Sequence, residues 1–300
     1  MIAGPDSAAR QQGIALALAS AAAFGSNIIG AQLAGQAGLS GPLLVFYRVF
    51  IMLALVGVAA ALLRASLRIP PGQGRPLIAF GLTSALVGSA YLSSVAFVPV
   101  SVAAVVFYTF PVLIVLAEPL LTPARFSPDR LVIALVAFLG VALVVGPGLD
   151  GLDLRGLALA MAASVLAAAQ FFAAGACART PLVPKLLWSH LLILPVTIII
   201  LWLVGGFLPP QAIAVAPLAF ALATGTYLLG FLLQVMALAR VAPGAAALAF
   251  CAEPVFSVAI AAVVLGERLG PVQYAGGALV VGAIMANVIL EQKRAQPAPA

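Results

Sequence analysis

Residues 249–266 read AFCAEPVFSVAIAAVVLG, an apolar run that holds one carboxylate, Glu253, directly before one proline, Pro254. A helix that crosses a bilayer needs about 20 mostly apolar residues, because each residue adds about 1.5 Å. Within hydrocarbon a charged side chain and a broken backbone hydrogen bond are both costly. The run therefore predicts a membrane-spanning helix that carries a deliberate interruption near its middle.

The composition of the whole chain agrees with this interpretation. The 300 residues are 64% hydrophobic and only 7% charged, with a mean hydropathy of +1.23. A soluble protein is about 45–50% apolar and about 25% charged, so the chain is an integral membrane protein. The net charge of +6 does not indicate nucleic-acid binding, because the basic residues form no cluster with interleaved aromatics. Cys177 and Cys251 lie in apolar runs without metal-ligand spacing, and we expect no metal or cofactor.

Further apolar runs of spanning length occur along the chain. Ten are expected, at residues 13–34, 42–63, 76–96, 101–121, 129–147, 154–177, 185–205, 216–238, 243–265 and 268–290. With a cytoplasmic N-terminus, eleven basic residues face the inside: Arg10, Arg64, Arg68, Arg75, Arg125, Arg130, Arg179, Lys185, Arg240, Lys293 and Arg294. Only Arg155 and Arg268 face outside. The positive-inside rule then predicts that both termini are cytoplasmic.

The proline of the opening run has a twin in the first half of the chain. One constant offset in residue number joins three pairs: Pro111 and Pro254, Arg125 and Arg268, Pro128 and Pro271. GIALALASAAAFGSN at 13–27 resembles GLALAMAASVLAAAQ at 156–170 with the same offset. FYRVFIM at 46–52 aligns with WSHLLIL at 188–194, with an offset that is shorter by a single position. The chain is therefore expected to be an internal duplication.

Five spans in each copy fix the relation between the copies. An odd number of helices makes the second copy start from the opposite side of the membrane, which is an inverted-topology repeat. The predicted fold is an all-α integral membrane protein with ten transmembrane helices in two inverted five-helix repeats. We place these repeats at residues 1–150 and 151–300, the second with a short cytoplasmic tail. Inverted repeats are typical of transporters that work by alternating access, and a duplicated bundle without transport is the alternative.

Three segments carry a resemblance to a known family. FGSN at 24–27 is similar to a W-G-x-N pattern in the family's first helix, with Phe in place of Trp. FYRVFIMLAL at 46–55 is similar to its second-helix motif with Arg. ALARVAPGAAALAFCAEPVFSVAIAAVVLGERL at 237–269 is similar to its ninth-helix signature. On these segments the chain resembles, over essentially its whole length, the EamA branch of the drug/metabolite transporter superfamily. The resemblance implies a ten-helix transporter of metabolites or amino acids, often an exporter, in a bacterial inner membrane.

The first half departs from the pattern of the second. Position 124 is Ala where the second copy has Glu267, and the residue before Pro111 is Phe110 where the second copy has Glu253. The acidic residue is thus present only in the second repeat, whereas the proline is present in both. Pro111 and Pro254 each release a carbonyl four residues earlier, at Phe107 and Phe250, and are predicted to act as hinges. Two static kinks are the alternative.

Four ionisable residues are expected inside the spans: Arg48, Glu118, His190 and Glu253. Arg48 either extends to the outer headgroups or lines the cavity and attracts a substrate carboxylate. His190, at the equivalent place in the second repeat, either contacts substrate or is a satisfied group near the interface. Glu118 is expected nearer the interface than the membrane centre. Glu253 either couples proton and substrate movement, binds an amine, or satisfies groups at the helix break.

The remaining candidates for the substrate site are polar or aromatic side chains near the breaks. Asn27 and Gln170 form a repeat-related pair of amides. Tyr91, Tyr108 and Tyr227 offer ring faces and hydroxyls. Gly276, Gly277 and Gly282 are more consistent with close helix packing or dimer contact than with chemistry.

The predicted function is secondary transport, with export favoured, of a small metabolite such as an amino acid, by the protein as a monomer or homodimer. The chain has no GxxxxGK[ST] motif for ATP, so a gradient must drive transport, through proton coupling or facilitated diffusion. A passive channel is an alternative, although the sequence offers no carbonyl-rich filter or charged ring. An intramembrane enzyme is a weaker one, because every Asp lies in a loop or tail and no nucleophile motif accompanies His190.

Overall fold

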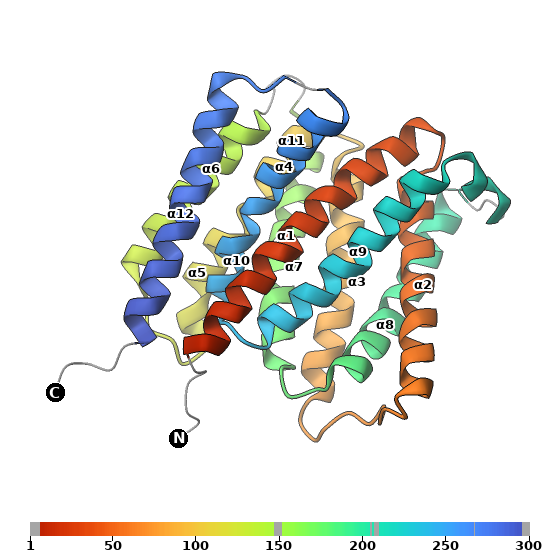
Figure 1. Ribbon diagram of the computed structural model, residues 1–300, viewed down its shortest axis with the longest axis horizontal. Helices are drawn as coiled ribbons and strands as arrows, with labels where there is room; N and C mark the ends of the chain where they lie inside the picture. Colours follow the sequence, from red (N-terminus) through yellow and green to blue (C-terminus); the bar gives the residue numbers. More distant parts are fainter. Residues whose placement is uncertain (1–6, 147–151, 205, 207–209, 267, 296–300) are drawn as a thin grey trace.

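A computed structural model describes residues 7–146, 152–204, 206, 210–266 and 268–295, and their secondary structure is entirely helical (Figure 1). The first half contains α1 (Ser7–Gln36), α2 (Gly41–Leu62), α3 (Gly74–Ser94), α4 (Val100–Phe107), α5 (Phe110–Leu121) and α6 (Pro128–Val145). The second contains α7 (Leu154–Ala176), α8 (Leu182–Leu203), the short 3-10 helix η1 (Pro210–Val215), α9 (Pro217–Leu238), α10 (Pro243–Phe250), α11 (Ala252–Val264) and α12 (Pro271–Ala295). Because α4 continues into α5 and α10 into α11, the described residues form ten spans long and apolar enough to cross a membrane.

The predicted spans agree with these helices at most ends. The largest differences are at α1, which begins at Ser7 rather than at residue 13, and at α12, which ends at Ala295 rather than at residue 290. Both extensions are polar, so hydropathy does not mark them, although the helical hydrogen bonding continues through them.

Local sequence explains where several helices start and stop. The Ser40 hydroxyl accepts a hydrogen bond from the amide of Leu43 at the start of α2, and Ser127 caps α6 in the same way through the amide of Arg130. Each cap is followed within two residues by a proline, which is tolerated in a first turn because its missing N–H has no helical partner there. α6 ends at Gly146, whose left-handed conformation (φ 59°) suits a residue without Cβ.

The helices repeat along the chain with the predicted spacing. α3 and α9, α4 and α10, and α6 and α12 begin at positions separated by the same offset as the twin prolines. The two repeats do not form separate bodies: α1 packs along α9, and the related pair α7 and α3 packs in the same way. α6 pairs with α12 at one side of the bundle and α2 with α8 at the other (Figure 1). The prediction of ten helices in two inverted five-helix repeats is confirmed.

Close backbone approaches hold the two repeats together. A Cβ built on Gly30 of α1 would lie 2.6 Å from the amide nitrogen of Ala223 on α9. The Ser20 hydroxyl donates a 2.6 Å hydrogen bond to the carbonyl oxygen of Gly230, and the ring of Phe24 covers the same glycine. Small residues at the crossing thus let α1 and α9 meet at backbone distance, as is common between membrane helices.

α6 and α12 meet through a second pair of glycines, Gly140 and Gly276. A Cβ built on Gly276 would lie 2.7 Å from the carbonyl oxygen of Gly140. We expect Gly276→Val to lower the free energy of unfolding by about 1–3 kcal/mol, because backbone atoms cannot move aside as a flexible side chain can. Thermal unfolding of the purified protein in detergent measures this change.

The same helix supplies the matched control. Gly282 has no atom of another element within 4 Å of a built Cβ, so Gly282→Val should leave the unfolding temperature nearly unchanged. Equal effects of the two substitutions would contradict the assignment of Gly276 to the helix contact. Gly277 has only a distant contact, with Val255 at 3.8 Å.

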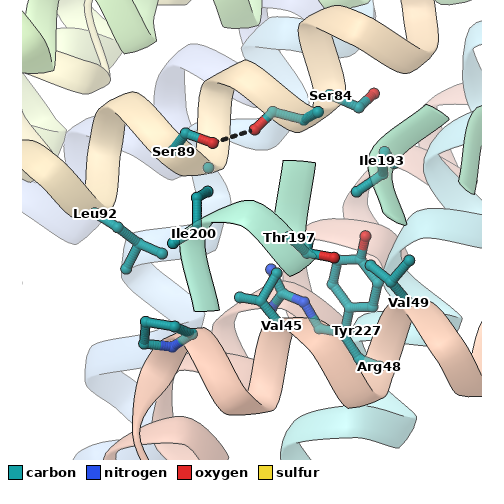
Figure 2. A pocket seen from close by; sticks show the side chains of 13 residues that line it. Val45, Arg48, Val49, Ser84, Ser89, Leu92, Ile193, Thr197, Ile200 and Tyr227 are labelled. Atoms are coloured by element: carbon teal, nitrogen blue, oxygen red, sulfur yellow. Dashed lines mark hydrogen bonds between the residues drawn. The ribbon is translucent and has the colours of Figure 1, made fainter. Parts of the chain in front are cut away.

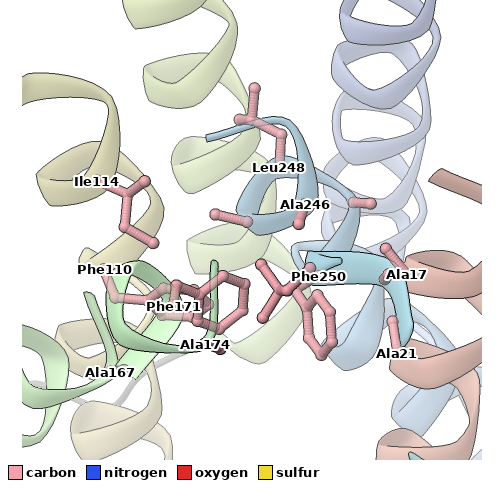
Figure 3. Packing of buried hydrophobic residues seen from close by; sticks show 14 of the residues in the cluster. Ala17, Ala21, Phe110, Ile114, Ala167, Phe171, Ala174, Ala246, Leu248 and Phe250 are labelled. Carbon is pink, nitrogen blue, oxygen red and sulfur yellow. The ribbon is translucent and has the colours of Figure 1, made fainter. Parts of the chain in front are cut away.

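Packing density differs between the two ends of the bundle. We call the end where α1 starts and α12 ends the termini end. There α10 is buried at every residue from Gly244 to Phe250, and rings and small residues fill the space around it (Figure 3). Beyond the break, only Ala252, Pro254 and Ala261 are buried in α11. α4, the repeat counterpart of α10, buries only Val102 and Ala103. The repeats therefore have the same topology but different packing, and the bundle is more tightly closed at its termini end.

Candidate functional site

Two spans are interrupted at equivalent positions. α4 ends at Phe107 and α10 ends at Phe250, the two residues whose carbonyls the prolines were predicted to release. Pro111 and Pro254 lie in the first turns of the half-helices that follow, where a missing N–H costs little. The breaks are therefore present as predicted, while their role as hinges stays a prediction.

Side-chain hydrogen bonds stabilise the break between α4 and α5 and connect it to α7. The Thr109 hydroxyl shares a 2.7 Å hydrogen bond with the hydroxyl of Ser164 on α7 and also donates to the carbonyl oxygen of Val106. Irregular backbone at membrane depth persists only where protein or water satisfies it. α7 thus provides part of that support.

A pocket lies between α2, α3, α8 and α9 (Figure 2). Its lining comprises Pro42, Val45, Arg48 and Val49 from α2, Ser84, Ala85, Gly88, Ser89 and Leu92 from α3, Ile193, Thr197 and Ile200 from α8, and Tyr227 from α9. Most of the wall is apolar, and a guanidinium and several hydroxyls converge on it. That combination is typical of small-molecule sites, where a few polar groups fix orientation.

Arg48 is the charged group of this pocket. Its guanidinium carbon lies 3.9 Å from the centre of the Tyr227 ring, a cation–π contact. Within the described residues its buried Nε has no hydrogen-bond partner, and the side chain forms no ion pair. A half-buried cation with only a ring as its described counterpart is poorly compensated. The arrangement favours the prediction of a carboxylate-attracting group over a side chain that reaches the headgroups.

Tyr227 connects Arg48 to His190. The His190 ring is fully buried, 4.6 Å from the ring centre of Phe231 and 6.5 Å from that of Tyr227. Its Nδ1 lies 2.9 Å from the carbonyl oxygen of Leu186 on the preceding turn, while Nε2 is buried without a partner among the described residues. His190 thus lies behind the pocket wall and not in its lining. In this conformation it cannot contact a substrate directly, contrary to one of the two predictions for it. The alternative of a satisfied group near the interface does not fit the unpartnered Nε2 either.

Glu253 lies in the first turn of α11, directly after the break, and is half-buried. Its carboxylate lies close enough to Tyr108, at the other break, and to Tyr91 of α3 to interact electrostatically with both. The ring of Phe107 joins the two tyrosines at 5.3–5.4 Å. Three of the predicted site residues therefore gather around the two breaks, as an acid with two phenols.

Aromatic rings link this cluster to the Arg48 pocket. The ring centres of Phe110 and Phe171, and of Phe171 and Phe250, are 5.3 Å apart. Phe24 continues the series, 6.2 Å from Phe250 and 6.1 Å from Tyr227. Together these rings form a floor across the centre of the bundle, between the looser end and the tightly packed termini end.

The two predicted amides have protein partners. The Asn27 side chain donates a 2.5 Å hydrogen bond to the carbonyl oxygen of Ala223 and so ties α1 to α9. The Gln170 side chain donates to the hydroxyl of Ser84, a pocket residue, at 2.8 Å. Gln170 thus lies directly behind the pocket, whereas Asn27 serves the helix contact. Their roles as ligands stay predictions.

A buried charge network at the termini end was not predicted from the sequence. Arg130 of α6 donates to Glu118 of α5 at 2.5 Å and also pairs with Glu291 of α12, which in turn pairs with Arg10 of α1 at 3.7 Å. Glu118 is only 3% exposed and lies in the last turn of α5, so it is buried within the protein near the end of its span. Gly244 of α10 packs on its carboxylate. Because the partners lie on four different spans, no local pattern could have revealed them.

Hydroxyl side chains of the pocket were also missed. Ser84, Ser89 and Thr197 lie in apolar helices, where such residues commonly bond their own backbone, as Ser89 does to Ala85. In sequence these residues look like the other hydroxyl residues of the spans. They differ only in that α3 and α8 are turned so that these side chains point into the pocket. Among the described residues, no group of three His, Cys, Asp or Glu side chains could hold a metal ion.

Comparison with known proteins identifies relatives. A model described as the EamA-like transporter family matches residues 11–146 and again residues 154–289. A comparison with curated proteins gives no match. A solved structure described as "Crystal structure of protein" superposes with a TM-score of 0.75 over 95% of this chain and 99% of its own, at 22% sequence identity. At that identity the likeness concerns the fold alone.

Proposed function

The chain belongs to the EamA-like transporter family, within the drug/metabolite transporter superfamily, and we propose that it exports small metabolites such as amino acids. Membership makes it a multi-pass membrane transporter of small solutes. Its direction, substrate and mechanism are the proposal. We place it in a bacterial inner membrane with both termini in the cytoplasm, on the strength of the basic residues at the termini end.

The unequal packing of two topologically inverted repeats carries the proposal of alternating access. α10 is buried from Gly244 to Phe250, yet its counterpart α4 is mostly not. If the repeats exchanged these environments, the bundle would open at the termini end and close at the other. Such an exchange is the general basis of transport by inverted repeats. The two half-helix breaks supply the positions where each span can bend.

The chemistry of the site supports a substrate with a carboxylate. Arg48 offers donors in a fixed planar arrangement that matches a carboxylate, and its only described counterpart is the Tyr227 ring. Ser84, Ser89 and Thr197 add hydroxyls that accept or donate. Glu253, with Tyr108, is the second charged group near mid-membrane and serves as a proton acceptor or an amine ligand.

Flux through liposomes tests the proposed function. Purified protein is expected to move labelled amino acids with saturable kinetics, and unlabelled substrate on the opposite side should stimulate exchange. Linear, non-saturating flux would support a passive channel instead. Absence of flux across a broad panel of metabolites would remove the transporter proposal.

Glu253 is the test for proton coupling. Glu253→Gln should flatten the dependence of transport on pH, because the amide keeps the size of the side chain beside Tyr108 but does not titrate. Initial rates across a pH series in liposomes measure this. Pro254→Ala, one residue away, should change the rate but keep the shape of the profile. A wild-type profile in Glu253→Gln would exclude Glu253 as the coupling group.

A further inference from the structure

Arg48 and His190 are repeat counterparts, because FYRVFIM at 46–52 aligns with WSHLLIL at 188–194. The offset of the twin prolines also joins Ser84 of α3 with Tyr227 of α9, and both of these line the pocket. The inversion that relates the repeats thus maps part of the pocket onto itself. It also maps the cation that lines the pocket onto a fully buried imidazole.

The helices around these two residues are packed unequally. α3 packs more extensively on α8 than its counterpart α9 does on α2. At the closer contact, a Cβ built on Gly81 would lie 2.6 Å from Leu192. The counterparts of that pair are Thr224, whose buried hydroxyl has no partner in the described part of the chain, and Phe50, which is 55% exposed. His190 therefore lies on the closed side of an asymmetric pair of contacts, and Arg48 on the open side.

The geometry of the imidazole fixes what its free atom can do. The Leu186 carbonyl can only accept, so Nδ1 of His190 carries the proton in their 2.9 Å hydrogen bond. Nε2 of the neutral ring is then a bare acceptor, and it is the atom without a partner in the described residues. A buried acceptor of this kind is costly unless some state of the protein supplies a donor.

We propose that His190 is the second pole of the substrate site: Arg48 binds the carboxylate of a zwitterionic substrate in the conformation described above, and in the conformation open at the termini end Nε2 of His190 accepts a hydrogen bond from the ammonium group of the same substrate. This inference rests on the proposed function and deepens it by assigning the residue that recognises the ammonium end of the substrate. Arg48 can only donate and His190 Nε2 can only accept, so the two poles match the two ends of an amino acid. Tyr227 contacts both side chains and so connects the two poles.

Thiol labelling tests the alternating exposure of the two poles. In a chain with Cys177 and Cys251 replaced by alanine, Arg48→Cys and His190→Cys should react with a membrane-impermeant methanethiosulfonate from opposite sides. His190→Cys should be labelled only from the termini side. Leu191→Cys is the control: Leu191 is the neighbour of His190 and 40% exposed, on the apolar outside of a span that faces lipid, so it should not react. Labelling of His190→Cys from the same side as Arg48→Cys, or from neither, would overturn the inference.

Transport kinetics test the chemistry. The probes are the amino acid with the highest saturable flux and the same acid without its amino group, which for leucine is 4-methylpentanoate. His190→Leu should raise the half-saturating concentration of the amino acid on the termini side about tenfold or more and leave that of the deaminated acid unchanged. His190→Gln restores an acceptor and should recover most of the loss.

The outcomes separate this inference from the proposed function. If wild-type protein carries saturable flux but His190→Leu affects both probes equally, the ammonium role is wrong and transport stands. The inference also fails if the solutes carried contain no amino group. Only a wild-type protein without any saturable flux would remove both.

Discussion

Arg130→Leu is expected to lower the free energy of unfolding by about 3–5 kcal/mol, the largest loss of stability of any single substitution considered for this protein. Arg130 is bonded to Glu118 and Glu291, and the three side chains are at most 7% exposed. Removal of the guanidinium leaves two buried carboxylates, of which Glu291 keeps only the 3.7 Å contact with Arg10. Thermal or denaturant unfolding in detergent, followed by circular dichroism, measures the loss.

Two further variants make this result specific. Arg155 forms an ion pair of similar length with Asp153, at 2.7 Å, but on the surface, where Arg155→Leu should have little effect on stability. Arg130→Leu combined with Glu118→Leu and Glu291→Leu should be more stable than Arg130→Leu alone, since no carboxylate then stays unpaired. Equal stability of Arg130→Leu and Arg155→Leu would show that the buried network does not hold the four spans together.

Arg48→Gln should reduce kcat/KM for a carboxylate-bearing substrate by about 10–100-fold, the loss expected for one hydrogen bond to a charged group. The amide preserves polarity but loses the charge and the planar set of donors that faces the pocket. Initial rates in liposomes over a range of substrate concentrations give this ratio. An esterified substrate, which lacks the carboxylate charge, should lose much less.

The controls for Arg48 separate charge from stacking. Arg48→Lys retains a positive charge without the planar contact on Tyr227 and should restore only part of the activity. Arg155 also lies over an aromatic ring, 4.7 Å from the centre of Phe97, yet outside the pocket. Arg155→Gln should therefore transport as wild type does. Unchanged kcat/KM in Arg48→Gln would exclude Arg48 from the substrate site.

Features that repeat along the chain were predictable from sequence. The twin prolines indicated both helix breaks, because proline acts on the backbone of its own helix and needs no partner to do so. Their constant offset, shared by Arg125 and Arg268, similarly indicated the inverted halves. Helix ends were less certain at α1 and α12, where polar residues extend a helix beyond its apolar part.

The facing of side chains was not predictable in the same way. Arg48 and His190 occupy equivalent places in sequence, yet one lines a pocket and the other is sealed behind Tyr227. That difference arises because α3 packs more closely on α8 than α9 does on α2. Such packing depends on the whole bundle and cannot be read from the sequence around either residue. The burial of Glu118 was not predictable for a related reason, since it depends on Arg130 and on the close approach of Gly244.

The contact between α1 and α9 has a consequence for the making of this protein. Ser20 and Gly230, which hydrogen-bond across that contact, are 210 residues apart in the chain. At a synthesis rate of about 5–20 residues per second, α1 waits about 10–40 s in the membrane before α9 exists. During that time the side chains of Ser20 and Asn27 lack the carbonyls they bind in the finished bundle. The first helix to be inserted is thus among the last to form its native contacts. Until α9 is inserted, the polar side chains of α1 need other hydrogen-bond partners in the membrane.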